Sequence, residues 1–489
     1  MLRSSFCRAR PPALARPVSG PWQRRHLLTI GIETSCDDTS VAVLETRDQS
    51  RRLWPKDESD AVLHFHDKVT ANNTSYKGIH PLAALESHHE NIAPLLQKAI
   101  RHLPKVEQDK ASNDLNVVAV PSEDASGVDF RMKPDFIAVT RGPGMMSNLS
   151  TGLQTAKGLA TAWAIPLVGV HHMHAHALTP RLASALTHKS GADGSGPTGQ
   201  NAPAVEPQFP FLSLLVSGGH TLIIRSDSLE THHVLGSTTD RAIGQCLDRA
   251  GRLIVPRNLV DDWGDTMYAR LLECFAFPNG PEDYDYTPPK NRGEEIGKRV
   301  TSWGWGFQAP MGASPAGLKA FSMDMSFAGT LTSVENFIRF GLNKDTGRLS
   351  KMPRAAGDVS EDERRCMARE IMRITFEHLA SRVVLALQDI SKTNPELAQT
   401  LPVVVSGGVA SNMYMRRVLS EFLANKGYPD IKLLYPPLDL CTDNAAMIAW
   451  AGIEMFRAGH QTPLTCLPIR KWSLEDLITP PTNSDIQAA

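Results

Sequence analysis

Two Ser-Gly-Gly triplets, each directly after a short run of apolar residues, constrain the fold of this chain more than any other feature. The first lies in Phe211-Leu-Ser-Leu-Leu-Val-Ser-Gly-Gly-His-Thr221 and the second in Leu401-Pro-Val-Val-Val-Ser-Gly-Gly-Val-Ala-Ser-Asn412. Such runs predict buried strands that lead into tight turns. Because glycine has no side chain, backbone N–H groups in these turns can approach a phosphate closely. The pattern therefore predicts a nucleotide cradle.

A histidine-rich stretch, Gly169-Val-His-His-Met-His-Ala-His-Ala-Leu-Thr-Pro180, follows another apolar run. No proline or glycine interrupts it before Pro180, so we expect a helix on which His172 and His176 share one face. Two imidazoles at this spacing can hold one metal ion. His174 falls on a different side of such a helix and should point away from them.

A third ligand should come from elsewhere, and Asp443 in Pro436-Pro-Leu-Asp-Leu-Cys-Thr-Asp-Asn-Ala-Ala-Met447 is the candidate because it opens an Ala-rich helix. By itself, a His-x-x-x-His pair is more often structural. Two histidines and one carboxylate would leave coordination positions open, which suits a catalytic ion better than a structural one. The ligand types fit zinc and iron alike. If Asp443 joins the histidine pair, the three residues can hold one divalent metal ion, Zn or Fe, per subunit.

Length and composition indicate a globular protein in two parts. At 489 residues the chain is too long for one ordinary core. No apolar run approaches the roughly 18 residues of a membrane-spanning helix, so we expect no membrane anchor. The first thirty residues contain six arginines, several serines and no carboxylate, which is typical of a mitochondrial transit peptide. A basic arm that binds nucleic acid is the alternative.

Three stretches have the composition of surface insertions: residues 104–133, 189–208 and 278–315. The third contains Trp303-Gly-Trp305 and four basic residues, Lys290, Arg292, Lys298 and Arg299. Aromatic rings and positive charge together can stack bases and hold phosphates. A solvated loop is the simpler interpretation, and the sequence leaves both open.

Five blocks occur in a fixed order along the chain. They are Gly31-Ile-Glu-Thr-Ser-Cys-Asp-Asp38, Thr140-Arg-Gly-Pro-Gly144, His171-His-Met-His-Ala-His176, Val216-Ser-Gly-Gly-His-Thr221, and the pair Ser406-Gly-Gly-Val-Ala-Ser-Asn412 with Cys441-Thr-Asp-Asn444. Taken together, they resemble the tRNA N6-adenosine threonylcarbamoyltransferase family in its mitochondrial form. Matched segments run from about residue 28 to about residue 460.

The resemblance implies an α/β, two-lobed actin/Hsp70-like ATPase fold with a central cleft. Residues 29–208 plus 441–489 would form the first lobe. Residues 209–440 would form a second, nucleotide-binding lobe with an insertion at about 278–315. Residues 1–28 would be the transit peptide of a protein of the mitochondrial matrix. Alternating apolar residues around the Ser35-Cys-Asp-Asp-Thr turn fit the strand-turn-strand start of such a lobe.

The resemblance also implies a reaction: transfer of the threonylcarbamoyl group from L-threonylcarbamoyladenylate to N6 of adenosine 37 in tRNAs that read ANN codons. His172, His176 and Asp443 would be the metal ligands. The partners would be tRNA, a separate synthase that supplies the adenylate, and a second copy of the chain in a homodimer. Asp37 and Asp38 resemble acidic residues near the threonyl end of the intermediate, although turn formation explains them equally well. No residue stands out as a general base, and we name none.

For the nucleotide, the resemblance implies contacts from Leu215, Val216, Ser217, Gly218 and Gly219. Asp248 would bind the ribose hydroxyls, and Asn412 the adenine edge. This half departs from the family at two points. Gln245 and Leu247 replace the usual Glu and Phe. The family's Tyr-Pro-Gly-Gly turn is absent, and we assign Gly264 of Asp262-Trp-Gly264 to its place.

Two other classes of function compete with this one. A zinc protease of the His-Glu-x-x-His kind needs a glutamate beside the first histidine as its base, and Met173 stands there instead. A non-catalytic scaffold or chaperone of the same fold would bind ATP and, as a scaffold, tRNA. Proteins of that kind do not need the histidine pair with Asp443.

Overall fold

The computed structural model describes residues 26–46, 59–76, 78–107, 116–122, 127–187, 205–312, 318–342, 346 and 348–488. Nearly all of the predicted transit peptide (1–28) lies outside these residues, as does most of the predicted insertion at 189–208. Within the described ranges, no helix has both the length and the apolar character needed to cross a membrane.

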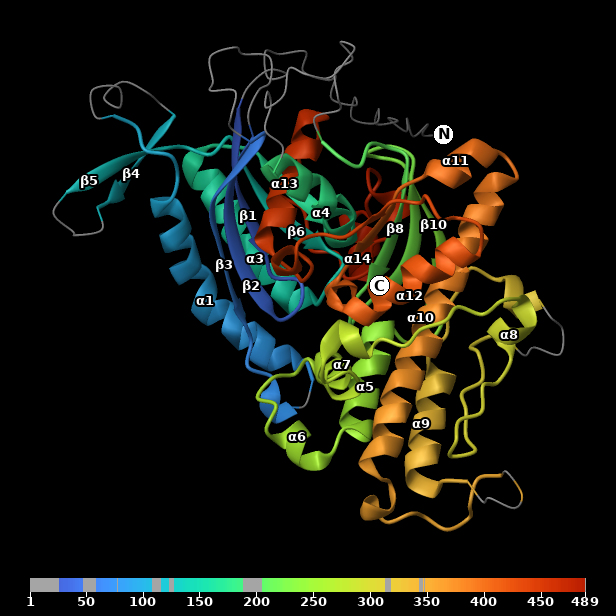
Figure 1. The fold of residues 1–489 in the computed structure, drawn as a ribbon. Helices are drawn as coiled ribbons and strands as arrows, with labels where there is room; N and C mark the ends of the chain where they lie inside the picture. The colour runs from blue at the N-terminus through green and yellow to red at the C-terminus, as the bar shows by residue number, and fades with distance from the viewer. Residues whose placement is uncertain are drawn as a thin grey trace, which may run out of the picture.

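The first of two five-stranded sheets has the order β3-β2-β1-β6-β7 (Figure 1). Its strands are β1 (Leu27–Glu33), β2 (Asp38–Thr46), β3 (Ala61–Thr70), β6 (Phe136–Gly142) and β7 (Leu167–His171). Strands β1, β2 and β3 pair antiparallel, whereas β6 is parallel to β1 and β7 is parallel to β6. The predicted strand-turn-strand start is confirmed by the β1-β2 hairpin.

The second sheet repeats this topology in the order β10-β9-β8-β11-β12. Its strands are β8 (Phe211–Val216), β9 (Thr221–Ser226), β10 (His232–Ser237), β11 (Val403–Ser406) and β12 (Leu433–Leu434). Strands β8, β9 and β10 pair antiparallel, and β11 and β12 continue parallel to β8. Two sheets with one shared order confirm the predicted two-lobed actin/Hsp70-like fold.

Helices form layers outside and between the sheets (Figure 1). Helices α1 (Pro81–Arg101) and α3 (Met146–Trp163) cover the outer face of the first sheet, where Ile30, Ile32 and Val41 point. Leu212, Leu214 and Val216 of β8 point to the opposite outer layer. That layer consists of α5 (Ile243–Ile254), α7 (Tyr268–Ala276), α9 (Ala328–Phe340), α10 (Glu361–Ser391) and α12 (Met413–Asn425).

The central layer lies between the sheets and contains α4 (His172–Thr187) and α13 (Ala445–Arg457). Phe211 and Leu215 of the second sheet share one apolar core with these helices and with the first sheet. At Gly31, an added Cβ would lie 2.4 Å from Ala445 O, so this glycine lets α13 approach β1 closely. The start of α13 is thereby fixed against the end of β1. The division into lobes at residues 208 and 440 stays a prediction.

Helix α4 continues through Pro180 to Thr187, because burial of α4 between the sheets outweighs the loss of one helical hydrogen bond. One sequence expectation needs correction here. The segment 278–315 is not only surface, because Trp305 and Phe307 are each 1% exposed and belong to the core beside α10. In residues 104–133, the described parts form the hairpin β4 (Val117–Pro121) and β5 (Val128–Met132).

The remaining short elements connect these layers. They are α6 (Arg257–Asp261), α8 (Arg292–Ile296), α11 (Pro395–Thr400), α14 (Asn483–Ala488), and the 3-10 helices Thr74–Tyr76, Gly280–Asp283, Leu318–Phe321, Ala356–Asp358, Gly408–Ser411, Leu438–Leu440 and Leu474–Asp476.

Candidate active site

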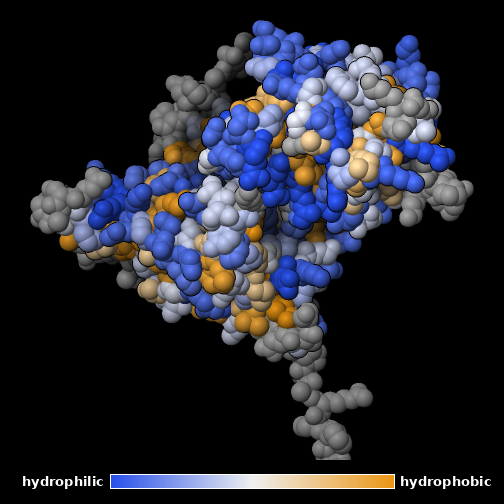
Figure 2. All heavy atoms as spheres, turned by 90° about the horizontal axis from the view of Figure 1, so that it is seen from below, coloured by the Kyte–Doolittle hydropathy of each residue, from blue (hydrophilic) through white to orange (hydrophobic). Residues whose placement is uncertain are grey.

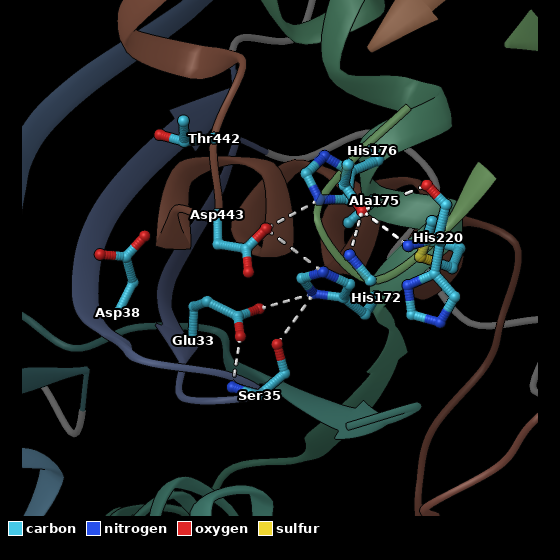
Figure 3. A network of polar contacts seen from close by, with 12 residues as sticks. Glu33, Ser35, Asp38, His172, Ala175, His176, His220, Thr442 and Asp443 are labelled. Atoms are coloured by element: carbon cyan, nitrogen blue, oxygen red, sulfur yellow. Dashed lines mark hydrogen bonds and ion pairs between the residues drawn. The ribbon is translucent and has the colours of Figure 1, made fainter. Parts of the chain in front are cut away.

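Three side chains from distant parts of the chain meet between the sheets (Figure 3). His172 and His176 lie one turn apart at the start of α4, and Asp443 precedes the Asn444 cap of α13. Asp443 Oδ1 is 3.4 Å from Nε2 of His172 and 3.0 Å from Nε2 of His176. One possible ligand atom from each residue lies within 4.8 Å of the other two. The structure thus brings the three predicted ligand side chains together.

His172 is oriented by Glu33, at the end of β1, and by Ser35 (Figure 3). The distance from His172 Nδ1 is 3.2 Å to Glu33 Oε2 and 3.2 Å to Ser35 Oγ. An ionised carboxylate can only accept, so Nδ1 of His172 donates a proton to Glu33. This arrangement leaves Nε2 facing Asp443, which is the orientation that a carboxylate gives to a metal-binding histidine.

Charge in this cluster favours a bound cation. Burial alone would raise the pKa of Asp443, but His172 and His176 hold it well below its usual value. The pKa of Glu33 is also lowered, because interactions with His172 outweigh burial. Burial would lower the pKa of His172, whereas Asp443 and Glu33 raise it well above the ordinary value. Both carboxylates are therefore ionised at neutral pH, in a site with little access to water.

Two further histidines, His174 of α4 and His220 just before β9, differ from the ligand pair. The ring of His174 is buried and lies 5.0 Å from the ring of His232, away from Asp443, as helical spacing predicted. His220, just after the Ser217-Gly-Gly turn, lies beside the cluster (Figure 3). Burial, followed by the charge of His172, lowers the pKa of His220 to about 4, so it is neutral at pH 7.

The acidic turn after β1 is tied to the Asp443 loop by Lys68 of β3. Lys68 Nζ is 3.1 Å from Asp38 Oδ2 and 2.9 Å from Thr442 Oγ1. Asn73 donates to Asp37 Oδ2 at 3.0 Å. Burial, with the charge of Asp38, raises the pKa of Asp37 to about 6. Asp37 and Asp38 are therefore part of an ordered polar network, which serves at least to hold the turn.

The first Ser-Gly-Gly turn is open to solvent. Gly218 and Gly219 are exposed, and an added Cβ would meet no atom within 4 Å at either residue. Ser217 Oγ accepts from the N–H groups of Gly219 at 3.2 Å and His220 at 3.0 Å. The side chains of Leu215 and Val216 are buried in β8, so these residues can offer a ligand only backbone atoms. The turn has the room that a phosphate needs.

The other predicted nucleotide residues, Asp248, Gly264 and Asn412, lie in the helical part of the second half of the chain. Asp248 of α5 accepts from Ala269 N–H at 2.7 Å, and burial raises its pKa to about 6. Gly264 has φ +68°, between α6 and α7, which explains a glycine there by backbone conformation alone. Asn412 is buried and caps α12, because its Oδ1 accepts from Met415 N–H at 2.8 Å. Their nucleotide roles stay predictions.

Sequence reasoning missed Glu33, Lys68 and His220 as residues of this site. Glu33 could have been singled out from the sequence, because it is a carboxylate at the end of the apolar strand Leu27–Glu33. Its partner, His172, is 139 positions away, and no local pattern connects them. Lys68 reaches Thr442 across 374 positions, so its role depends entirely on the tertiary fold.

The fold and the site define a two-lobed α/β protein with a nitrogen and oxygen donor cluster between its sheets. The sequence model of the tRNA N6-adenosine threonylcarbamoyltransferase family matches residues 64–190 and 198–450. The chain belongs to this family. A mitochondrial tRNA N6-adenosine threonylcarbamoyltransferase of Schizosaccharomyces pombe is 31% identical over 461 residues, which cover 93% of this chain and 88% of that protein.

Solved structures give more distant similarities. HypF of T. kodakarensis is 12% identical, with a TM-score of 0.38, over 89% of this chain and 48% of that one. Component A of the (R)-2-hydroxyglutaryl-CoA dehydratase of Acidaminococcus fermentans is 11% identical, with a TM-score of 0.36, over 88% of this chain and 97% of that one.

Proposed function

We propose that this chain is a mitochondrial enzyme that transfers the threonylcarbamoyl group of L-threonylcarbamoyladenylate to N6 of adenosine 37 in tRNAs reading ANN codons. Family membership supports the acyl transfer to tRNA, and the S. pombe relative is named as mitochondrial. One structural observation carries the mechanism. The cluster of His172, His176 and Asp443 lies beside His220 and the open Ser217-Gly-Gly turn, in the space between two lobes.

The cluster fits one divalent cation, zinc or iron, held by His172, His176 and Asp443. The donors are two imidazole nitrogens and one ionised carboxylate, and His172 is already oriented through Glu33. Three protein ligands leave room for a substrate oxygen. When bound, such a cation supplies Lewis-acid stabilisation of negative charge on the acyl oxygen. The identity of the metal is not fixed by this donor set.

The protein's own groups would position the two halves of the adenylate. Gly218 is exposed and its N–H has no hydrogen-bond partner within the described ranges, so it can bind the phosphate that leaves with AMP. The Asp248 carboxylate would accept from the ribose hydroxyls, and Asn412 would contact the adenine edge. The amine of adenosine is a weak nucleophile, so this positioning and charge stabilisation must supply most of the catalysis.

The partners follow from this reaction. tRNA is the acceptor, and a separate synthase would supply the adenylate. We propose a homodimer, as the resemblance implies. The non-catalytic scaffold remains the competing function, and the protease is disfavoured because buried Met173 cannot act as a base beside His172.

A matched pair of variants tests the metal centre. His176→Gln should lose bound metal and reduce transfer at least a thousandfold, because it removes one ligand of three. His174→Gln changes a buried histidine of the same helix that does not face Asp443, so metal and transfer should remain. Metal would be counted by mass spectrometry of the purified protein, and transfer by mass spectrometry of tRNA nucleosides. Full transfer by metal-free His176→Gln would refute the proposal.

The competing scaffold function has its own test. Absence of transfer by the native protein with adenylate and tRNA would favour the scaffold.

A further inference from the structure

The insertion at 278–315 separates into an inward and an outward set of residues. Trp305 is 1% exposed, and its Nε1–H donates to Glu363 Oε1 at 3.0 Å. Arg292 forms an ion pair with Glu295 and donates to Ala320 O at 2.8 Å. Both residues therefore attach the insertion to the second lobe. Of the aromatic and basic residues that the sequence groups in this insertion, Trp305 and Arg292 thus have a structural role.

The outward set is cationic. Lys290, Lys298 and Arg299 line one surface pocket, in which Glu294 is the acidic residue among the described lining. Lys290 and Lys298 are exposed and have no ion-pair partner in the described part of the chain. Arg299 is 36% exposed, and its Nη2 lies 3.5 Å from buried Glu377. Three cations against one accessible carboxylate leave a positive surface here.

An exposed aromatic ring, Trp303, follows Arg299 by four positions and lines a second pocket of mixed charge, with Asp283, Asp285, Asp362 and Glu370 beside Arg365, Arg369 and Arg373. Trp303 is 38% exposed and lies at the tip of a turn that is closed by Gly304 N–H donating to Thr301 O at 2.9 Å. Its ring packs nearly parallel to that of Trp305, with centroids 6.4 Å apart. The outer face of Trp303 is thus rigidly supported and accessible. A supported, exposed indole suits stacking on an unpaired base.

Neither the charge of the whole chain nor the acidic residues at the metal cluster favour a polyanion. The whole chain carries a formal charge of −1, and the metal cluster is surrounded by Glu33, Asp37, Asp38 and Asp443. These acidic residues offer the RNA backbone little attraction, so positive charge for holding RNA should come from a local patch. Figure 1 shows α8, which belongs to the insertion, at the outer edge of the second lobe and away from α4 and α13. Most of the face in Figure 2 is hydrophilic, with its hydrophobic residues in small groups.

We propose that Lys290, Lys298, Arg299 and Trp303, called here the insertion patch, bind the tRNA substrate outside the catalytic cleft. This inference rests on the proposed function, because tRNA is the acceptor there. The three cations would contact backbone phosphates, and Trp303 would stack on an unpaired base. The patch would raise the affinity for tRNA without touching the adenylate, so it should act on KM for tRNA and leave kcat unchanged.

Charge reversal and aromatic removal separate the two kinds of contact. Lys290→Glu with Lys298→Glu should weaken binding of an unmodified tRNA transcript at least about tenfold. It should also lower the slope of log Kd against log salt by about 1.5, because two phosphate contacts are lost. Trp303→Ala should weaken binding about tenfold and leave the slope unchanged. Fluorescence anisotropy across a salt series measures both quantities. The milder Lys290→Gln with Lys298→Gln keeps the test open if charge reversal impairs folding.

The matched control reverses Lys351 and Lys432, which are also exposed and have no ion-pair partner within the described ranges. It changes the net charge by the same amount at other places. Equal tRNA affinity and salt slope in the patch and control variants would overturn the proposal. So would a patch variant that loses binding only to anionic lipid vesicles. Binding is measured without adenylate, so loss of transfer in His176→Gln with intact tRNA affinity would concern the proposed function alone.

Discussion

Ser217-Gly-Gly and Ser406-Gly-Gly share three residues in the same order, at the ends of β8 and β11, which are neighbouring parallel strands. In the first turn, Gly218 and Gly219 are exposed and face open space. In the second, Gly407 is buried at φ +97°, and an added Cβ would lie 2.4 Å from Val216 O. The glycines of one turn leave room for a ligand, whereas Gly407 lets two segments of backbone pack. The same three-residue motif is thus explained by space for a ligand in the first turn and by close backbone packing in the second.

The largest expected effect comes from adding a methyl group to the packed turn. Gly407→Ala should lower the free energy of unfolding by about 3 kcal/mol or more, because positive φ costs about 1–2 kcal/mol and the clash with β8 adds to it. Urea unfolding followed by circular dichroism measures the loss. Gly218→Ala is the matched control and should change stability by less than about 0.5 kcal/mol. Equal stability losses in both variants would remove the distinction between the turns.

A substitution in the open turn should change the affinity for AMP instead of the stability of the protein. Gly218→Val should weaken AMP binding by tenfold to about a hundredfold, because its side chain fills the space in front of the turn. Calorimetric titration with AMP measures the affinity, and thermal unfolding checks that the fold is kept. Unchanged affinity would mean that the phosphate binds elsewhere.

Buried strands and the two metal-ligand segments could be predicted from the residues because their signals are local, whereas the two-lobed fold follows only from the family resemblance. Apolar runs ending in Ser-Gly-Gly fixed two strands, and the spacing of His172 and His176 fixed their shared face on α4. Glu33 and Lys68 could not be predicted in this way, because each depends on a distance between segments that only the packed lobes determine. The cap that Asn412 forms on α12 is local, since its Oδ1 accepts from Met415 N–H three residues on, so an asparagine before a helix was an available signal. Trp305 was misplaced as surface because its loop-like neighbours hide a ring buried beside α10.

The affinity for AMP should depend on pH through Asp248 and not through Asn412. Burial raises the pKa of Asp248 to about 6, so its carboxylate is protonated as the pH falls from 7 to 5. Because ribose hydroxyls donate to the ionised form, AMP affinity should fall by up to about tenfold at pH 5. The raised pKa also means that ionised Asp248 is destabilising, and protonation relieves this cost. In Asp248→Asn the affinity should be weaker at pH 7 and fall less steeply than in the native protein, because the phosphate of AMP, with a second pKa of about 6, still titrates in this range. Asn412→Ala, which carries no titratable group, should keep the slope of the native protein.

The smallest effects concern the serine of each turn. Ser217 Oγ accepts from Gly219 and His220, so Ser217→Ala should cost about 1 kcal/mol of stability and weaken AMP binding a few fold. Ser406 Oγ is buried and has no hydrogen-bond partner within the described residues, so Ser406→Ala should be neutral or slightly stabilising. Urea unfolding of both variants measures the difference. A loss of more than about 1 kcal/mol in Ser406→Ala would show that its hydroxyl has a partner, such as a buried water. The second turn would then need its polar atoms as much as the first does, and the contrast between the turns would be confined to their glycines.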